Sequence, residues 1–247
     1  SVSVGWYHTC AINNQGNIEC WGRDANGDGI PYPNPPLGSF IFLTTDYQQN
    51  WGIDNLGNIE CWGFFCNQPT PEGIFTNIAV EGNITCAIKN GSIECWGSEN
   101  QGDVQEVFDI PGDTFVDVVV GDAHVCALDT NGSVQCWGAN WYNQVSETPN
   151  GIYTSISAGR YHTCAINIEG NIECWGSNWL GESDNKEGDF ISVSASYYHT
   201  CAINIEGSIE CWGGEDNGEN DQFNYIPEGE FTTISTGRFH TCAIGTP

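Results

Sequence analysis

Short segments in which apolar and polar residues alternate recur along the chain. Three clear examples are "YTSISAG" from Tyr153, "FISVSAS" from Phe190 and "FTTISTG" from Phe231. Alternation with a period of two residues is typical of a β-strand with one buried face. No segment sustains the 3.6-residue apolar period of an amphipathic helix, so the pattern predicts an all-β protein.

Each alternating segment begins a repeated unit, which reads as strand, bend, strand, tight turn, strand and polar loop. Seven copies of the middle segment lie 35 to 41 residues apart, aligned on Cys10, Trp51, Cys86, Cys126, Cys164, Cys201 and Cys242. The third segment ends in Cys-Trp-Gly and occurs six times, from Cys20, Cys61, Cys95, Cys136, Cys174 and Cys211. We expect one domain (1–247) made of units 1–38, 39–74, 75–113, 114–152, 153–189 and 190–230 and a partial unit 231–247.

The turn between the middle and third segments fixes the register of the expected hairpin. If Cys164 lies opposite Cys174, the turn is Ile168-Glu169-Gly170, a three-residue loop that ends in glycine. The Cys86 copy is one residue shorter, and its turn becomes Asn90-Gly91, the preferred two-residue hairpin turn. Directly opposed residues are close enough for a disulfide. The register therefore predicts the pairs Cys10–Cys20, Cys86–Cys95, Cys126–Cys136, Cys164–Cys174 and Cys201–Cys211.

Three cysteines fall outside this rule. In the second unit Trp51 replaces the first cysteine, so Cys61 lacks its usual partner, and Cys66 follows five residues later. We expect a Cys61–Cys66 bond. Cys242 is then unpaired, or bonded to another chain.

Units of this length, with three or four short strands each, favour a β-propeller over a β-solenoid or a set of small domains. In a propeller both faces of a blade are covered by neighbouring blades. Both faces of the segment "NIECWG" carry large apolar or sulfur-containing residues, which fits such burial.

The repeated motif resembles the regulator of chromosome condensation repeat. Two copies that carry the resemblance are "SISAGRYHTCAINIEGNIECWGSNWLGES" and "SVSVGWYHTCAINNQGNIECWGRDANGDG". The resemblance covers nearly the whole chain and implies a seven-bladed propeller. Members with paired cysteines are extracellular, as in crinkly-type plant receptor kinases, and the β-lactamase inhibitor protein II shares the fold.

The chain departs from this family in two places. The family's "GQLG" segment is degraded, for example at Gly27 and Gly181, and the seventh unit lacks its Cys-Trp-Gly strand. The seventh blade is then incomplete, closed by the chain ends, or completed by another chain. An open strand edge is a docking surface unless it is covered.

Composition narrows the location and the partners. The net charge of −27, with five Lys and Arg residues, disfavours binding to nucleic acid. Thirteen cysteines without a CxxC metal pattern indicate an oxidising compartment, so we expect a secreted or cell-surface protein. No apolar run is long enough to cross a membrane. The start at Ser1 implies a processed protein or an excised segment.

Two residue types recur at fixed repeat positions. A histidine begins the middle segment at His8, His124, His162, His199 and His240. A metal needs three or four converging ligands, and equivalent positions lie one blade apart, so we interpret these histidines as structural. An acidic residue or its amide precedes the second cysteine, at Glu19, Glu60, Glu94, Gln135, Glu173 and Glu210, and we expect structural partners for it among backbone or tyrosine groups.

The polar loops hold the candidate binding residues. Asp24, Asn26 and Asp28 resemble the start of a calcium loop, although the EF-hand form fails because position twelve is Pro35. "GGEDNGEND" from Gly213 is a weaker candidate, and no cofactor is required. Loop aromatics either bind a protein or glycan or pack between blades: Tyr32, Phe64, Phe65, Trp141, Tyr142 and Trp179. Asn83, Asn90 and Asn131 lie in N-glycosylation sequons.

No catalytic triad, phosphate loop or nucleophile elbow occurs in the sequence. We therefore expect a non-catalytic extracellular recognition or scaffold module that binds a protein or glycan through its loops. The alternative is a structural protomer of an extracellular filament or sheath, joined to copies of itself through the incomplete seventh unit. A third hypothesis is an enzyme, which requires a central pocket with perturbed carboxylates, whereas the acidic residues are spread over the repeats rather than converging.

Overall fold

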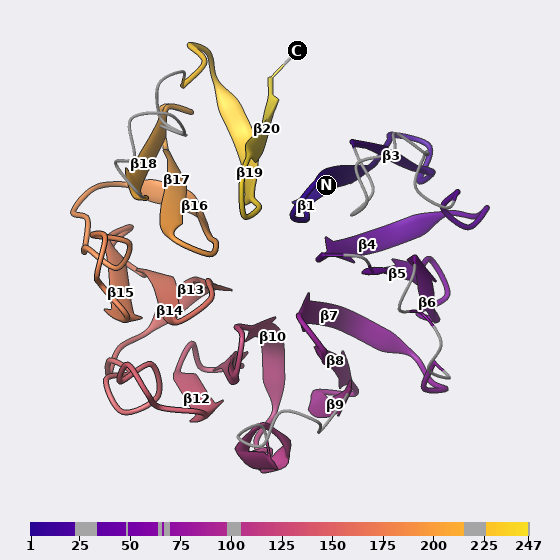
Figure 1. The fold of residues 1–247 in the computed structure, drawn as a ribbon, viewed down its shortest axis with the longest axis horizontal. Coiled ribbons are helices and arrows are strands. Elements are labelled where there is room, and N and C mark those ends of the chain that lie inside the picture. Colours follow the sequence, from indigo (N-terminus) through magenta and orange to yellow (C-terminus); the bar gives the residue numbers. More distant parts are fainter. Residues whose placement is uncertain are drawn as a thin grey trace.

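The computed structural model describes residues 1–22, 34–47, 49–63, 66, 70–97, 105–214 and 226–246. Within these residues the chain forms twenty β-strands and one short 3-10 helix, η1 (Gln105–Phe108). The strands pair antiparallel into six three-stranded sheets and one two-stranded sheet. Figure 1 shows these sheets arranged in chain order around a common centre. The all-β prediction is confirmed.

Each sheet contains consecutive strands in the order inner, middle and outer (Figure 1). The inner strands are β1 (Val2–Val4), β4 (Phe40–Thr45), β7 (Phe75–Glu81), β10 (Phe115–Val120), β13 (Tyr153–Ala158), β16 (Phe190–Ala195) and β19 (Phe231–Thr236). The middle strands are β2 (His8–Ile12), β5 (Gln49–Asp54), β8 (Ile84–Lys89), β11 (His124–Asp129), β14 (His162–Asn167), β17 (His199–Asn204) and β20 (Thr241–Gly245). The outer strands are β3 (Ile18–Gly22), β6 (Ile59–Gly63), β9 (Ser92–Gly97), β12 (Val134–Gly138), β15 (Ile172–Gly176) and β18 (Ile209–Gly213).

The hairpin between middle and outer strands has the register that the turn lengths predict. Cys164 lies opposite Cys174, and Gly170 ends the three-residue turn with a φ of +85°. In the shorter copy Cys86 still lies opposite Cys95, and Asn90 and Gly91 have φ angles of 53° and 79°. Positive φ at both central residues is the geometry of a type I′ turn. The deletion therefore changes the turn type and leaves every side chain on its face of the sheet.

Disulfides join the middle and outer strands in five of the described sheets. The paired Cα atoms are 4.0–4.1 Å apart in Cys10–Cys20, Cys86–Cys95, Cys126–Cys136, Cys164–Cys174 and Cys201–Cys211. In the second sheet Trp51 lies opposite Cys61, and Cys61 is bonded to Cys66. These pairs are the same as those expected from the sequence. Among the described cysteines, Cys242 has no disulfide.

Neighbouring sheets bury their faces against each other. Trp51 and Ile53 of the second sheet pack with Phe75 and Ile78 of the third. A middle strand is therefore covered on both faces, and β17 is buried at five successive residues. Each large apolar side chain that is fully buried contributes about 1.5–3 kcal/mol. The contacts between sheets are accordingly a main source of stability.

The two-stranded sheet β19–β20 lies beside the first sheet and closes the ring. The amide of Val4 donates to the Ser235 hydroxyl at 3.1 Å. A hydrogen bond of the same kind joins two later sheets, where the Thr236 amide donates to the Ser194 hydroxyl at 3.0 Å. The N-terminal strand β1 pairs with β2. Among the described residues, therefore, neither chain end supplies an outer strand to β20.

Candidate functional site

Short turns between inner and middle strands meet at the centre of one face of the ring. Each turn contains one residue followed by a dipeptide that leads into the middle strand. In the sequence these dipeptides are Trp6-Tyr7, Tyr47-Gln48, Gly82-Asn83, Asp122-Ala123, Arg160-Tyr161, Tyr197-Tyr198 and Arg238-Phe239. We call them the turn dipeptides. Their surroundings repeat from sheet to sheet, whereas the dipeptides themselves differ.

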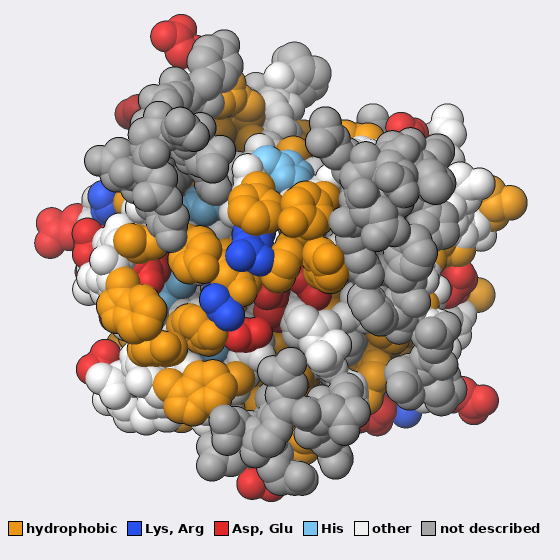
Figure 2. All heavy atoms as spheres, viewed as in Figure 1, with side chains coloured by type: hydrophobic (Ala, Val, Ile, Leu, Met, Phe, Trp, Pro, Cys, Tyr) orange, Lys and Arg blue, Asp and Glu red, His pale blue; other side chains and the backbone are white. Residues whose placement is uncertain are grey.

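A central cavity of about 170 Å³ lies where the inner strands end. Residues from every inner strand or its turn line it. The hydroxyl-bearing residues that line it are Ser3, Thr44, Thr45, Ser157, Ser196, Tyr197, Ser235 and Thr236, and the charged residues that line it are Asp46, Glu81, Arg160 and Arg238. Figure 2 shows cationic and acidic side chains at the centre of this face, surrounded by hydrophobic ones.

The residue before each turn dipeptide is small where adjacent sheets approach closely. A Cβ atom added at Gly5 would lie 2.5 Å from the carbonyl oxygen of Asp46, and one added at Gly159 would lie 2.2 Å from that of Ser196. The same position holds Gly121, Ser196 and Gly237 in other sheets, but Asp46 and Glu81 in the second and third. At this repeat position Asp46 and Glu81 therefore place two carboxyl groups at the centre, whereas the other sheets have an uncharged residue there.

These two carboxyl groups have strongly perturbed acidities. Burial raises the pKa of Asp46 to about 7, against the opposing effect of hydrogen bonds from the Tyr47 and Gly82 amides. The pKa of Glu81 is raised well above its ordinary value, first by burial and then by the charges of Asp46 and Asp122. A carboxyl in this position favours the protonated form, in which it can donate a hydrogen bond.

The acidic residues thus converge more than the sequence suggested. Asp46, Glu81 and Asp122 belong to three different sheets, yet their charges act on one another. The expectation that the acidic residues are spread out and do not converge is wrong for these three. The physical reason is that the turns of all the sheets meet at one centre, so residues about 40 positions apart become neighbours.

Arg160 links the acidic centre to the aromatic side chains around it. Its Nε atom is 3.3 Å from the Asp122 carboxylate. Its guanidinium lies 4.5 Å from the ring centroid of Tyr161 and 4.2 Å from that of Tyr197. Cation–π contacts of this kind are worth about 0.5–2 kcal/mol. Arg160 is thereby held in one orientation at the cavity.

Arg238 makes similar contacts from the next sheet but one. Its guanidinium lies 4.2 Å from the ring centroids of both Trp6 and Tyr197, and 5.0 Å from that of Phe239. Tyr197 is therefore shared by the two arginines. It also contacts the Trp6 ring at 5.5 Å and the Tyr198 ring at 4.8 Å.

Further ring contacts extend in both directions around the centre. Together with Arg160, which contacts both Tyr161 and Tyr197, they form one connected surface, which we call the aromatic collar. On one side Trp6 contacts Tyr47, which contacts Tyr7, which stacks on Phe239. On the other side Tyr161 contacts Trp141 and Tyr142, and Tyr142 contacts Trp179. The collar consists of Trp6, Tyr7, Tyr47, Trp141, Tyr142, Tyr161, Trp179, Tyr197, Tyr198 and Phe239.

Several collar rings are open to solvent. The exposed fraction is 73% for Trp179, 51% for Trp141, 49% for Phe239 and 40% for Tyr7. Exposed aromatic rings gathered around a polar cavity are typical of a binding surface. Of the loop aromatics singled out in the sequence, Trp141, Tyr142 and Trp179 belong to the collar, and Tyr32, Phe64 and Phe65 lie outside the described residues.

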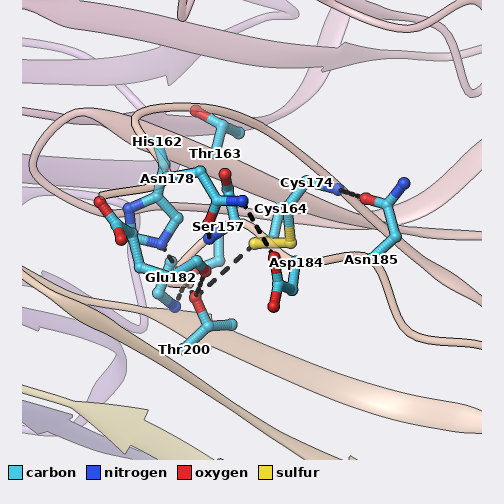
Figure 3. The surroundings of a disulfide bond; sticks show 12 residues. Ser157, His162, Thr163, Cys164, Cys174, Asn178, Glu182, Asp184, Asn185 and Thr200 are labelled. Carbon is cyan, nitrogen blue, oxygen red and sulfur yellow. Dashed lines mark hydrogen bonds between the residues drawn. A yellow bond between two sulfur atoms is a disulfide. The ribbon is translucent and has the colours of Figure 1, made fainter. Parts of the chain in front are cut away.

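The repeated histidines lie between sheets and away from the cavity. Figure 3 shows His162 pointing toward Thr200 of the next sheet, and their Nε2 and Oγ1 atoms are 2.9 Å apart. The Thr200 hydroxyl also donates to the Glu182 carbonyl oxygen at 2.9 Å. The same histidine contact to the following sheet occurs at His8–Asn50, His124–Thr163, His199–Thr241 and His240–Thr9. Burial lowers the pKa of His124 and His162 to about 3, so both rings are neutral near pH 7.

The repeated glutamates bind neighbouring side chains. Glu173 accepts hydrogen bonds from the Tyr153 hydroxyl at 2.8 Å and from the Asn167 side chain at 2.9 Å. Glu94 and Glu210 form ion pairs with lysines, at 3.4 and 2.9 Å. The pair with Glu94 lies within one hairpin, and the pair with Glu210 joins the loop after β15 to β18, so these contacts do not form a shared site.

The candidate calcium ligands Asp24, Asn26 and Asp28 lie outside the described residues, as does most of the segment after Gly214. Among the residues that the structure describes, no group of three His, Cys, Asp or Glu side chains is placed to hold a metal ion. The sequon residues Asn83, Asn90 and Asn131 are all exposed at turns. Asn83 belongs to a turn dipeptide, so a glycan on it would stand beside the cavity.

Most of the collar was not found from the sequence, although a signal for it exists. In the sequence, the aromatic residues just before the repeated histidine look like part of the repeat itself, as at Trp6, Tyr161 and Tyr197. A comparison of the repeats with each other shows that the turn dipeptides are the variable positions in a repetitive segment. Variation within a fixed frame indicates positions that are free of packing constraints and available for recognition.

The sequence profile of the Regulator of chromosome condensation (RCC1) repeat matches residues 1–28, 115–144, 153–181 and 190–219. These four segments of the chain are RCC1 repeats. The matched segments cover the inner, middle and outer strands of four of its sheets. No curated protein sequence matches the whole chain significantly.

Solved structures share the RCC1-type fold over nearly the whole chain. The ectodomain of the Physcomitrella patens receptor kinase CR4 superposes with a TM-score of 0.79 at 22% identity, covering 99% of this chain and 70% of that one. The CRINKLY WD40 ectodomain of the Arabidopsis thaliana receptor kinase ACR4 gives a TM-score of 0.70 at 21% identity, covering 86% and 78%. Prp20p of Saccharomyces cerevisiae gives 0.75 at 16% identity, covering 100% and 82%.

The RCC1-type fold recurs both in receptor ectodomains and in Prp20p, which is described by its binding to Gsp1p and histones. The fold alone therefore does not assign a partner. Among the described residues, no helix is long and apolar enough to span a bilayer.

Proposed function

We propose that this chain is a seven-bladed propeller that acts as a non-catalytic recognition module of a secreted or cell-surface protein. In this proposal the aromatic collar is its binding face. The observation that carries it is the connected set of aromatic rings and arginines around a polar cavity. Tryptophan, tyrosine and arginine are the residue types that most often dominate binding energy in protein interfaces.

The rigid placement of the collar side chains supports a role in binding. Most collar residues lie on the short turns between inner and middle strands, Trp141, Tyr142 and Trp179 lie in the loops after β12 and β15, and Arg160 and Arg238 are packed between rings. Side chains that are already ordered lose little conformational entropy when a ligand binds. A surface of this kind is preorganised.

The overall charge of the chain favours a protein ligand with a basic surface. The net charge of −27 attracts cationic partners over a distance. Inside the cavity, beside Arg160 and Arg238, Asp46 and Glu81 can donate or accept hydrogen bonds with a polar group of the ligand. A glycan that stacks on the exposed rings is the other ligand class that the collar could accept.

The perturbed carboxyl groups also fit the enzyme hypothesis, which requires them. We favour binding because the groups exposed at the mouth are aromatic rings and arginines, and the carboxyl groups lie beneath them. Asp122, the third acidic residue, is engaged with Arg160.

The extracellular location rests on the disulfides. Six bonds join cysteines in the described residues, and reducing compartments do not maintain such bonds. The likeness to plant receptor ectodomains agrees with this location. Assembly of copies through the two-stranded sheet is a second candidate function, favoured by the exposure of β20.

The binding proposal is tested with collar variants that leave the frame intact. The immobilised protein is screened against a display library of extracellular proteins and against a glycan array. Each ligand found is then measured with a Trp179→Ala, Phe239→Ala variant. A matched control replaces Leu56 and Ile168, two exposed side chains at hairpin turns on the far ends of the middle strands.

The collar variant is expected to weaken binding at least tenfold and the control variant to leave it unchanged, because removal of one interface hot spot costs about 2 kcal/mol or more. Equal affinities of both variants would show that the ligand binds elsewhere. If a screened compound is turned over and the Glu81→Gln variant loses this turnover, the result would favour the enzyme hypothesis.

A further inference from the structure

The central cavity has the size of a single ring-shaped group. Its volume is about 170 Å³. An engineered protein cavity of about 150 Å³ holds a benzene molecule, whereas pockets for drug-sized ligands measure about 300–1,000 Å³. The cavity therefore accommodates one six-membered ring and is too small for a folded segment of a partner.

Serine hydroxyls on the cavity wall have a proton to donate. The Ser157 oxygen accepts a hydrogen bond from the Ala195 amide at 2.9 Å, and the Ser235 oxygen accepts one from the Val4 amide at 3.1 Å. Neither hydroxyl forms another hydrogen bond with a described residue. Because an amide N–H only donates, each hydroxyl keeps its own proton for a further partner. Both serines line the cavity, so its wall offers donors to a ligand.

The Glu81 side chain lines the cavity and forms no hydrogen bond with any described residue. By contrast, Asp46 accepts hydrogen bonds from the Tyr47 and Gly82 amides. Burial raises the pKa of Glu81, and the protonated carboxyl that burial favours can both donate and accept. A buried polar group without a partner is unfavourable, so a ligand that bonds to Glu81 removes this penalty.

The charges around the cavity disfavour a charged ligand group. An ammonium or guanidinium group would lie near Arg160 and Arg238, and a carboxylate would lie near Asp46, Glu81 and Asp122. An apolar group would leave the hydroxyl and carboxyl groups of the wall without hydrogen bonds. A neutral group with several hydroxyls avoids all three penalties, because each hydroxyl both donates and accepts.

Aromatic rings at the cavity fit the apolar part of such a group. Trp6 and Tyr197 both line the cavity, and their ring centroids are 5.5 Å apart. The Arg238 guanidinium lies 4.2 Å from each ring and helps to hold both in place. A pyranose carries hydroxyls along its edge and C–H groups on its faces. Its edge therefore fits the polar wall while one face packs against these rings.

We propose that the central cavity binds one neutral pyranose ring, the terminal sugar of an extracellular glycan, with Glu81 and Ser157 as hydrogen-bond partners of its hydroxyls. This inference rests on the proposed function, because it takes the aromatic collar as the entrance to the site. It adds the chemical group that the centre recognises, whereas the overall charge of the chain acts on the ligand as a whole.

The test measures sugar binding to the native protein by saturation-transfer difference NMR and by calorimetry. The neutral probes are glucose, galactose and mannose. The amino sugar and the uronic acid derived from each hexose keep its ring but carry a positive or a negative charge.

Two variants act on the cavity itself. Glu81→Ala removes the carboxyl group, and Ala79→Leu narrows the cavity but keeps its polar groups. The matched control is Asp117→Asn, which alters a carboxyl of an adjacent inner strand that does not line the cavity and whose pKa burial also raises. Circular dichroism checks that each variant is folded.

At least one neutral hexose should bind at millimolar concentration, at least tenfold more tightly than its amino sugar and its uronic acid. Glu81→Ala and Ala79→Leu should each weaken this binding at least tenfold, and Asp117→Asn should leave it unchanged. Binding of none of the hexoses, tighter binding of a charged sugar, or unchanged binding in both cavity variants would overturn the proposal. The comparison among sugars uses only the native protein, so it decides the question even if a variant does not fold.

The sugar site and the proposed function can fail separately. If no hexose binds but a screened ligand still depends on Trp179 and Phe239, the sugar site is wrong and the collar remains the binding face. If a hexose binds through Glu81 but no screened ligand depends on the collar, the sugar site stands and the collar is not the binding face.

Discussion

His240 and Thr9 are separated by 231 residues, yet the His240 ring nitrogen lies 2.9 Å from the Thr9 hydroxyl oxygen. The same contact joins His162 to Thr200 in the interior of the chain. The boundary between the last and first sheets is therefore built like any other boundary in the ring. The contribution of this boundary to stability can therefore be measured by removing the contact.

The first prediction concerns this closure. Thr9→Val keeps the shape of the side chain but leaves the His240 ring without its hydroxyl partner. A lost hydrogen bond of this kind costs about 1–2 kcal/mol, so the urea midpoint should fall. Thr232→Val, at an exposed position of β19 in the two-stranded sheet, should change the free energy of unfolding by less than about 0.5 kcal/mol. An unchanged midpoint for Thr9→Val would mean that the contact does not stabilise the ring.

A second prediction concerns Asp46. Because the pKa of Asp46 rises to about 7 in the folded protein, the folded state holds this proton more tightly than the unfolded state. The corresponding stability is fully present below about pH 4 and is lost as the pH rises through about 7. Asp46→Asn should therefore stabilise the protein at pH 8, by on the order of 2–4 kcal/mol, and change little at pH 4. Urea denaturation at both pH values, with Glu169→Gln as an exposed control, checks this difference.

The buried histidines predict the opposite pH dependence. Burial lowers the pKa of His162 to about 3, so stability is present above about pH 6.5 and is lost as the pH falls toward 3. Gln49 occupies this position in the second repeat, which makes His162→Gln a natural replacement. The variant should lose less stability between pH 7 and pH 4 than the wild type, by on the order of 2–3 kcal/mol. His240→Gln should show a smaller effect because its ring is less buried, and equal acid sensitivity of all three proteins would contradict the explanation.

A fourth prediction tests the packing of the arginines at the collar. Tyr197→Leu removes the ring that both Arg160 and Arg238 contact, whereas Tyr197→Phe keeps it. The leucine variant should lose about 1–3 kcal/mol of unfolding free energy more than the phenylalanine variant, from two cation–π contacts. Thermal unfolding of both variants provides the comparison, and indistinguishable melting temperatures would rule out a stabilising role for the stacked arginines.

The last prediction concerns the hairpin disulfides. Cys164→Ala with Cys174→Ala removes a bond that closes a short loop, and the expected loss is roughly 2–3 kcal/mol. The hairpin of the second sheet forms with Trp51 opposite Cys61, so the double variant should keep the fold. Chemical denaturation measures the loss, and circular dichroism should be unchanged in buffer. Loss of the β-sheet spectrum would show that the bond is needed for folding rather than for stability alone.

Much of the fold could be predicted because the repeat is a strong local signal. The change from a three-residue turn at Gly170 to a two-residue turn at Asn90 fixes the strand register within one hairpin. The disulfide pairs follow from that register. Both inferences depend only on residues that are close in the sequence.

The centre of the candidate site could not be predicted in the same way. Asp46 and Glu81 look like isolated departures from a glycine position, and their proximity depends on how the sheets are arranged around the ring. Trp141 and Trp179 were recognised because they stand in polar loops. Trp6 and Tyr197 lie inside the repeated segment, so in the sequence they look like part of its frame.

The turn dipeptides have a consequence for how this protein can change. Each one stands on the same hairpin ends, and several are tied to the framework by backbone hydrogen bonds, as from the Arg160 amide to the Ser196 carbonyl oxygen and from the Ser177 amide to the Tyr161 carbonyl oxygen. A new binding specificity therefore requires new dipeptides and no new architecture. Antibodies likewise differ in their binding loops while they share one β-sandwich framework. Exchange of one dipeptide for that of another sheet would move a chemical group around the central axis while the remaining sheets stay as they are.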